Sequence, residues 1–160
     1  MARPPRIPNW LPWQETTVYF ITFCVQKRKP VLANGEAWQI CLEVFDRLDQ
    51  WHVLAAIAMP DHLHLLAAPQ DREASVSALS KWFKHWFNEA YRRSSVSGDR
   101  TPPQMSWHWQ ESCFDRLLRS DELLSDKWEY LRQNPVRAGF VTKPADWPYQ
   151  FAFNSNEVKL

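Results

Sequence analysis

Cysteine is scarce in this sequence, and its distribution excludes two common scaffolds of small domains. The three cysteines are an odd number, lie far apart and form no C-x-x-C pair. A disulfide framework needs paired cysteines, and a zinc knuckle needs closely spaced ones. Neither is indicated, and this cysteine usage fits a reducing cytoplasm best.

An excess of one charge and long apolar runs are also lacking. The 19 Lys and Arg residues nearly balance the 18 Asp and Glu residues, and the net charge is +1. This balance neither demands a nucleic-acid partner nor excludes one that binds a local basic patch.

The first residues lack the apolar segment of a secretion signal, and no stretch approaches the roughly eighteen apolar residues of a membrane span. We therefore expect a soluble, cytoplasmic protein with no membrane partner.

Aromatic residues, in contrast, are abundant. Ten Trp, nine Phe and four Tyr suit a thick core, which is the default interpretation, but they also suit platforms on which unpaired bases stack. A chain of 160 residues is long enough for one domain with a sizeable core. We expect an extended, basic and Pro-rich arm over 1–15, a single domain over 16–153 and a tail over 154–160.

Hydrophobic periodicity predicts four strands and three helices. Runs that alternate, or that are rich in β-branched and aromatic residues, predict strands over 16–25, 51–58, 62–68 and 105–110. Apolar residues at helical spacing predict helices over 37–50, 76–93 and 120–133. The order β, α, β, β, α, β, α is that of the split βαβ arrangement in ferredoxin-like sheets, with helices on one face and an added C-terminal helix. We predict an α+β fold with an antiparallel sheet.

Two histidines begin the third predicted strand, within the sequence MPDHLHLLA at 59–67. Side chains alternate faces along a strand, so His62 and His64 are expected on one face and Leu63 on the other. The preceding Pro60 and Asp61 favour a tight turn, which is the favoured interpretation of Asp61, and the alternative is a carboxylate that orients an imidazole. Two imidazoles that converge from one rigid strand could hold a metal ion, although one of them could equally be an ordinary hydrogen-bonded histidine.

Tyr130 and Asn134 are four residues apart near the end of the last predicted helix, which places them on the same side. A metal ion held by two neutral imidazoles and an amide oxygen keeps its full charge and open positions, which suits gripping a phosphodiester oxygen. A cation nearby would also make a phenol a usable nucleophile. The alternatives are a half-buried structural Tyr130 and an Asn134 that ends the helix before Pro135.

These residues stand within a longer set of motifs. In chain order the motifs are MPDHLHLL at 59–66, WQ at 109–110, FDR at 114–116, LR at 118–119, WEYLRQNPVRAG at 128–139 and DWPY at 146–149. Together they resemble the REP-associated tyrosine transposases, which are single-tyrosine HUH transposases of bacterial insertion sequences. One departure is that Gln150 and Phe151 follow WPY, where the family often has two serines.

The resemblance implies an activity and a set of site residues. His62, His64 and Asn134 match the metal ligands, and Tyr130 matches the nucleophile of a DNA endonuclease and strand transferase. Such an enzyme cuts single-stranded DNA beside a REP-like hairpin, gives a 5′-phosphotyrosine and a free 3′-hydroxyl, and uses Mg or Mn in DNA transposition. A monomer or homodimer associated with the nucleoid is expected.

Basic residues near these motifs are candidate DNA contacts, although most such residues on any surface are only solvated. The candidates are Arg3, Arg6, Lys84, Arg116, Arg119 and Arg137. Alternative functions are a catalytically silent hairpin-DNA-binding protein, a metal hydrolase that uses water, and an RNA-binding ferredoxin-like module. Trp107 and Trp109 could stack on bases, but core packing is the favoured interpretation.

Overall fold

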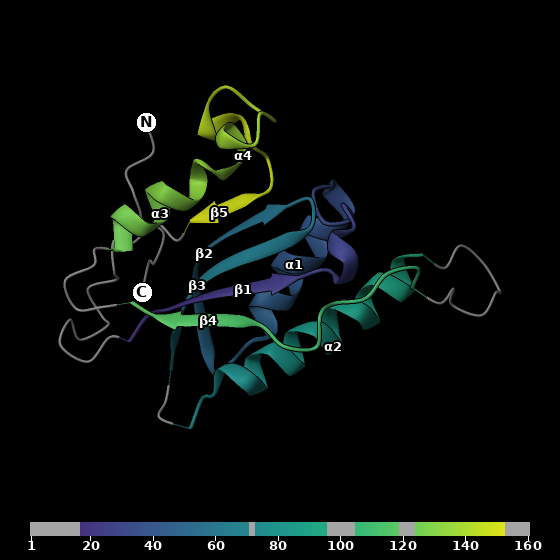
Figure 1. The fold of residues 1–160 in the computed structure, drawn as a ribbon. Coiled ribbons are helices and arrows are strands. Elements are labelled where there is room, and N and C mark those ends of the chain that lie inside the picture. The colour runs from purple at the N-terminus through teal and green to yellow at the C-terminus, as the bar shows by residue number, and fades with distance from the viewer. Residues whose placement is uncertain (1–16, 71–72, 96–104, 119–123, 153–160) are drawn as a thin grey trace.

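The computed structural model describes residues 17–70, 73–95, 105–118 and 124–152, and Figure 1 shows their arrangement. The predicted arm over 1–15 and tail over 154–160 lie outside these residues. Within the described ranges no helix is both long and apolar enough to cross a membrane.

Five antiparallel strands form one open sheet. The strands are β1 (Tyr19–Cys24), β2 (Trp51–Met59), β3 (His62–Pro69), β4 (Phe114–Leu117) and β5 (Gln150–Ala152). Their order across the sheet is β4-β1-β3-β2-β5, so β1 and β3 are central and β4 is an edge. The first four strands follow the ferredoxin-like order, and β5 is added outside β2. The predicted α+β fold is confirmed.

Helices α1 (Gly35–Arg47) and α2 (Val76–Ser94) cover one face of the sheet (Figure 1). Each begins at a side-chain cap, because Asn34 Oδ1 accepts from the Ala37 amide and Ser75 Oγ accepts from the Ala78 amide. Alternate residues of the strands bury their side chains against these two helices. Phe23 of β1 stacks on Phe83 of α2 with ring centroids 4.8 Å apart.

The opposite face carries α3 (Leu124–Arg132). Its apolar side, which comprises Leu124, Trp128 and Leu131, is buried against the other set of alternate strand residues, including Phe20 and Leu66. The short helix α4 (Asn134–Arg137) follows, and the 3-10 turn η2 (Pro144–Asp146) leads to β5. Another 3-10 turn, η1 (Gln26–Arg28), follows β1.

The predicted last strand over 105–110 is wrong. Those residues make only an isolated bridge, between Val25 and Trp109, and the strand β4 lies further along the chain. The alternation that suggested a strand has another cause, because Trp107 and Trp109 are both buried and pack against Phe87 of α2. The favoured interpretation of these tryptophans as core residues is confirmed.

The C-terminal segment contributes a strand that the sequence did not predict. Gln150, Phe151 and Ala152 pair with Ile57, Ala56 and Ala55 of β2. Trp147 fixes the approach to β5, since its buried Nε1 donates a hydrogen bond of 3.0 Å to the carbonyl of Ala58. The residues that follow the WPY motif thus extend the sheet.

Candidate active site

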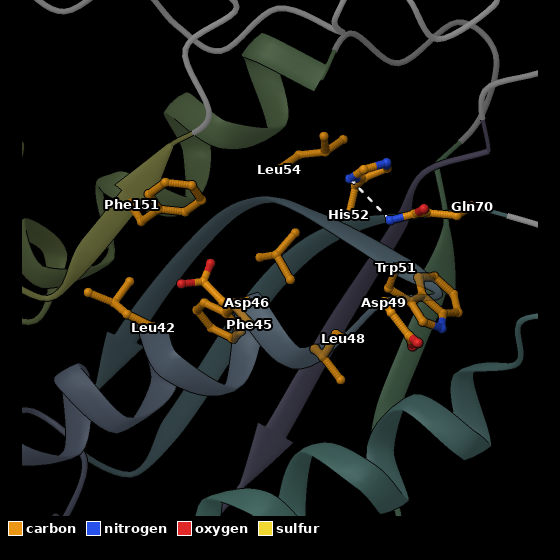
Figure 2. A pocket seen from close by; sticks show the side chains of 11 residues that line it. Leu42, Phe45, Asp46, Leu48, Asp49, Trp51, His52, Leu54, Gln70 and Phe151 are labelled. Carbon is orange, nitrogen blue, oxygen red and sulfur yellow. Dashed lines mark hydrogen bonds between the residues drawn. The ribbon is translucent and has the colours of Figure 1, made fainter. Parts of the chain in front are cut away.

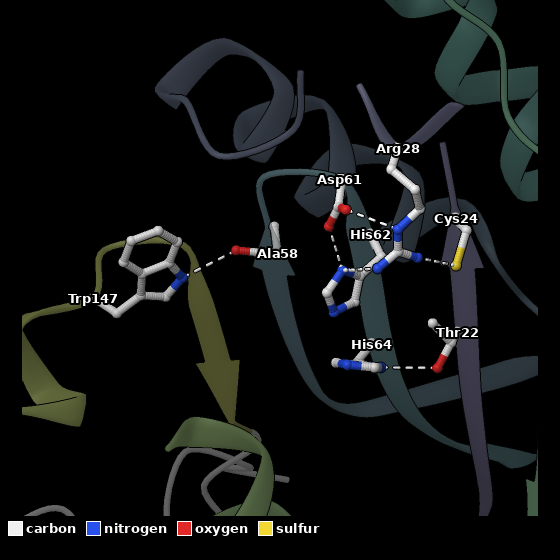
Figure 3. A network of polar contacts seen from close by, with 8 residues as sticks. All are labelled: Thr22, Cys24, Arg28, Ala58, Asp61, His62, His64 and Trp147. Carbon is white, nitrogen blue, oxygen red and sulfur yellow. Dashed lines mark hydrogen bonds and ion pairs between the residues drawn. The ribbon is translucent and has the colours of Figure 1, made fainter. Parts of the chain in front are cut away.

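The two histidines lie side by side at the start of the central strand β3 (Figure 3). Their ring centroids are 4.6 Å apart, and the ring planes meet at 76°. Leu63 between them is fully buried on the opposite face, among the residues that contact α1 and α2. The predicted placement of both imidazoles on one face is confirmed, and this face is the one that α3 partly covers.

His62 is oriented by a carboxylate. Its Nδ1 lies 2.6 Å from Oδ1 of Asp61, and because a carboxylate only accepts hydrogen bonds, Nδ1 carries the proton. Arg28 Nε pairs with the other oxygen of Asp61 at 2.8 Å, and its terminal nitrogen donates to Cys24 Sγ at 3.1 Å. The 3.5 Å between Arg28 and Nδ1 of His62 is too long to compete with the carboxylate. Nε2 of His62 takes part in none of these contacts.

His64 is oriented by a hydroxyl on the neighbouring strand. Thr22 of β1 is its register partner, and Thr22 Oγ1 lies 2.8 Å from Nδ1 of the ring. Burial, helped by the positive charges of His62, Lys127 and Arg28, lowers the pKa of His64 from 6.5 to about 3. Asp61 acts in the opposite direction. The imidazole is therefore neutral at neutral pH, which is the form that binds a metal ion.

The two imidazoles are arranged as two ligands of a metal ion could be. Each ring uses Nδ1 for an oxygen partner, as metal-binding histidines usually do, and this leaves both Nε2 atoms available. Among the described residues, no group of three or more His, Cys, Asp and Glu side chains could hold an ion. From the described part of the chain, a further ligand would be of another kind, such as an amide oxygen.

The turn that supplies Arg28 has an unusual backbone. Lys27 and Arg28 both adopt left-handed conformations, with φ of 56° and 53°. A residue with a Cβ atom adopts this region at a cost of about 1 kcal/mol or more. The Val25 amide, just before the turn, donates to the carbonyl of Asp61 at 3.0 Å. This contact holds η1 against the turn between β2 and β3.

Tyr130 lies on α3, on the side away from the buried stripe, and its ring is 60% exposed. Two cations flank the ring. Lys127 Nζ lies 5.3 Å and the Arg137 guanidinium carbon 4.5 Å from the ring centroid. Lys127 also lies 4.2 Å from the ring centroid of Phe20, which in turn is 5.2 Å from the ring centroid of His64. A series of contacts, from Tyr130 through Lys127 and Phe20, thus reaches His64.

Asn134 is not on the same helix as Tyr130. Helix α3 ends at Arg132, and Asn134 is the first residue of α4. Arg137 donates hydrogen bonds to Oδ1 of Asn134 and, at 3.0 Å, to the backbone carbonyl of Tyr130. The single continuous helix assumed for the two residues is therefore wrong, and the role of Asn134 as a third ligand remains a prediction.

The remaining candidate DNA contacts fall in different places. Arg116 lies on β4 opposite Phe20, on the histidine face, and Arg137 lies beside Tyr130. Lys84 lies on α2, where its ammonium donates to the carbonyls of residues 110, 111 and 112. Lys84 therefore anchors a loop on the side of the sheet away from the histidines, and its role as a DNA contact stays a prediction. The candidates Arg3, Arg6 and Arg119 lie outside the described residues.

Three contributors to this site were not predicted from the sequence. In the sequence, Thr22 is part of an apolar run and Arg28 is one charge among several, and for Asp61 a turn residue is favoured over a carboxylate that orients an imidazole. Thr22 and Arg28 give no local signal, because their partners His64 and Asp61 lie more than thirty residues away in the chain. Asp61 combines both interpretations, since it lies in the turn and binds the ring of His62.

A cavity lies away from the two histidines. A hollow of about 550 Å³ opens between the end of α1 and the start of β2, with Phe151 of β5 on its rim (Figure 2). Its polar lining includes Asp46, Asp49 and His52, which contacts Gln70 at 3.4 Å. None of the predicted site residues lines it, so the chemistry is assigned to the histidine face.

No protein-family model matches the chain. A curated Haemophilus influenzae protein named "Putative REP-associated tyrosine transposase" is 27% identical over 101 residues. The match covers 62% of this chain and 57% of that protein, so the chain matches little more than half of the relative's length.

Two solved structures have a similar fold. One, described as a REP-associated tyrosine transposase bound to a REP hairpin, has a TM-score of 0.62 and 18% identity, with 83% of this chain and 74% of that chain covered. The other, described as a "putative transposase" from Deinococcus radiodurans, has a TM-score of 0.51 and 16% identity over 80% of this chain and 95% of that chain. In both sequence and fold, this chain is similar to the REP-associated tyrosine transposases, as its motifs predicted.

Proposed function

We propose that this chain is a metal-dependent endonuclease and strand transferase that cuts single-stranded DNA beside a hairpin, with Tyr130 as the nucleophile. The observation that supports this most directly is the pair of oriented imidazoles on one strand. It lies on the same face as an exposed tyrosine flanked by two cations. The relatives named as transposases, one of them bound to a REP hairpin, support the reaction class and the DNA partner.

The Nε2 atoms of His62 and His64 would hold the divalent ion, Mg or Mn. When bound, such an ion polarises a phosphodiester oxygen and neutralises charge that develops at phosphorus. Asp61 and Thr22 hold the two rings by Nδ1, in an orientation that leaves both Nε2 atoms out of these contacts. The amide of Asn134 is proposed as a further ligand, and it would exchange its contact with Arg137 for this role.

The reaction at Tyr130 is a transesterification. The phenolic oxygen attacks the phosphorus, the bond between phosphorus and the 3′ oxygen breaks, and the departing 3′ oxygen takes up a proton. The phenol loses its own proton as the new phosphotyrosine bond forms. Lys127 and Arg137 lie against the ring, where their positive charge stabilises the phenolate that develops. Strand transfer is the reverse reaction with another 3′-hydroxyl, and it completes DNA transposition.

The test is the capture of a covalent protein–DNA adduct. The full chain is incubated with labelled stem-loop oligonucleotides that carry single-stranded flanks, drawn from repeats near the gene, in Mg or Mn or with a chelator. We expect an adduct that survives denaturation, depends on the ion and is lost in Tyr130→Phe. The matched control is Tyr91→Phe, which changes a tyrosine of α2 outside the site and is expected to keep the adduct.

Each contrary outcome is informative. An adduct that persists in Tyr130→Phe refutes the role of this tyrosine. Cleavage without any adduct indicates a hydrolase that uses water. Binding to the hairpin without cleavage in either metal ion indicates a catalytically silent hairpin-binding protein.

A further inference from the structure

An exposed aromatic ring lies on the histidine face, outside the residues discussed so far. Phe114 of the edge strand β4 is 60% exposed, whereas Phe23, Phe83 and Phe87 on the other face are fully buried. It packs edge-on against Phe20, with ring centroids 6.3 Å apart and planes at 69°. One exposed apolar side chain is ordinary in any protein, so exposure alone indicates nothing.

The position of Phe114 relative to the proposed metal site is more informative. Thr22 pairs with Phe114 on one side and with His64 on the other, so the three residues form one row across β4, β1 and β3. Directly paired residues of antiparallel strands share a face. Two strand spacings, about 10 Å in all, therefore separate the backbone of Phe114 from that of His64. About one or two nucleotides of a single strand can bridge this distance.

Positive charge lies beside the same row. Lys127 Nζ lies 4.2 Å from the ring centroid of Phe20, the ring that touches both Phe114 and His64. Arg116 is the register partner of Phe20 on β4 and therefore lies on this face as well. An aromatic ring next to a track of cations is the combination with which proteins bind single-stranded nucleic acids, because every base has a face that stacks and every linkage has a charge.

We propose that Phe114 stacks against an unpaired base of the single-stranded DNA next to the bond that is cut. This proposal rests on the proposed function, and it adds a base-binding subsite. The ring accepts any base, so it positions the strand with little sequence preference of its own. A fully paired stem cannot use it, because its bases stack on one another. The edge strand thus helps to place the phosphate between the imidazoles and Tyr130.

The experiment measures DNA affinity in the presence of a chelator, so that it does not depend on cleavage. The probes are a fluorescent stem-loop with a single-stranded flank and the same stem-loop without a flank. We expect Phe114→Ala to weaken binding to the flanked probe roughly 5- to 150-fold, and to leave binding to the unflanked stem unchanged. Phe114→Tyr should bind like the wild type, and Phe114→Leu should bind like Phe114→Ala.

Leu117 provides a matched control on the same strand. It is 50% exposed and pairs with Tyr19, which places its side chain on the opposite face of the sheet. Leu117→Ala removes a similar apolar surface and is expected to keep the wild-type affinity. Thermal unfolding of all four variants checks that the fold is unchanged.

Flank nucleotides replaced one at a time by an abasic site identify the stacked base. One position is expected to weaken binding to the wild type and to have no further effect in Phe114→Ala. The proposal is overturned if Phe114→Ala binds like the wild type, or if the abasic effects are the same in both proteins. Adduct formation is measured separately. A missing adduct with a position-specific Phe114 effect refutes the nuclease function alone, and a normal adduct without that effect refutes the stacking alone.

Discussion

Replacement of Thr22 by valine separates the orientation of His64 from the packing around it. Valine has nearly the same shape and suits a central strand, so the substitution removes only the hydroxyl that lies 2.8 Å from Nδ1 of the ring. Thr22 is only 8% exposed, so water cannot replace the lost partner easily. A buried polar group left without a partner costs about 1–3 kcal/mol. For a chain of this size that loss corresponds to a fall of roughly 2–12 °C in the Tm.

If His64 binds the ion as in the proposed function, the same substitution is expected to weaken metal binding about 10- to 100-fold, because the ring loses the contact that orients it. Thermal unfolding without metal measures the first effect, and calorimetric titration with Mn²⁺ measures the second. Thr22→Ser keeps the hydroxyl and should stay close to the wild type in metal affinity. Wild-type Tm and wild-type Mn²⁺ affinity in Thr22→Val would refute the role given to this hydrogen bond, and equal losses in the serine variant would assign the effect to packing.

Two further predictions concern stability. The pKa of His64 is about 3 in the fold and about 6.5 when the chain is unfolded, so between these values the unfolded state binds the extra proton. The free energy of unfolding of the metal-free protein should therefore fall as the pH is lowered from about 6.5, by at most about 1.4 kcal/mol per pH unit. Urea unfolding in a chelator measures this slope, His64→Gln should flatten it, and equal slopes would contradict the prediction. Trp147→Phe keeps a ring beside Phe140 but leaves the Ala58 carbonyl without its donor, at an expected cost of about 1–3 kcal/mol in urea unfolding. An unchanged free energy of unfolding would show that this bond does not secure the approach to β5.

The sequence predicted the elements that are largely buried. The strands β1, β2 and β3 are buried over most of their length and therefore appear in the sequence as apolar runs, whereas the helices α1 and α2 bury one side at helical spacing. The edge strand β4 is not visible in this way, because three of its four residues are exposed and its sequence FDRL has no apolar alternation. The strand β5 is only three residues long and follows Pro148, which gave no strand signal.

Only the site residues that belong to a motif or have a characteristic local spacing were predictable from the sequence. His62 and His64 share a face because they are two residues apart on one strand. Strand register brings Thr22 to the ring of His64, and the conformation of the turn brings Asp61 to the ring of His62. Neither the register nor the turn conformation can be predicted from a single sequence. Arg28 reaches Asp61 only because two consecutive residues adopt left-handed conformations, for which the sequence QKRK gives no sign. Helix α3 and helix α4 are separated at Gln133, two residues before Pro135. The sequence analysis used Pro135 only to limit how far the helix continues.

The two left-handed residues of η1, Lys27 and Arg28, differ in what a glycine substitution would cost. Glycine at position 27 would relieve about 1 kcal/mol of backbone strain, less the entropy that glycine costs, and would remove no side chain that contacts the histidines. Glycine at position 28 would relieve a similar strain, but it would also delete the guanidinium that holds Asp61 and Cys24. A more stable backbone at position 28 would therefore remove the support of the carboxylate that orients His62, whereas position 27 could be stabilised without that loss.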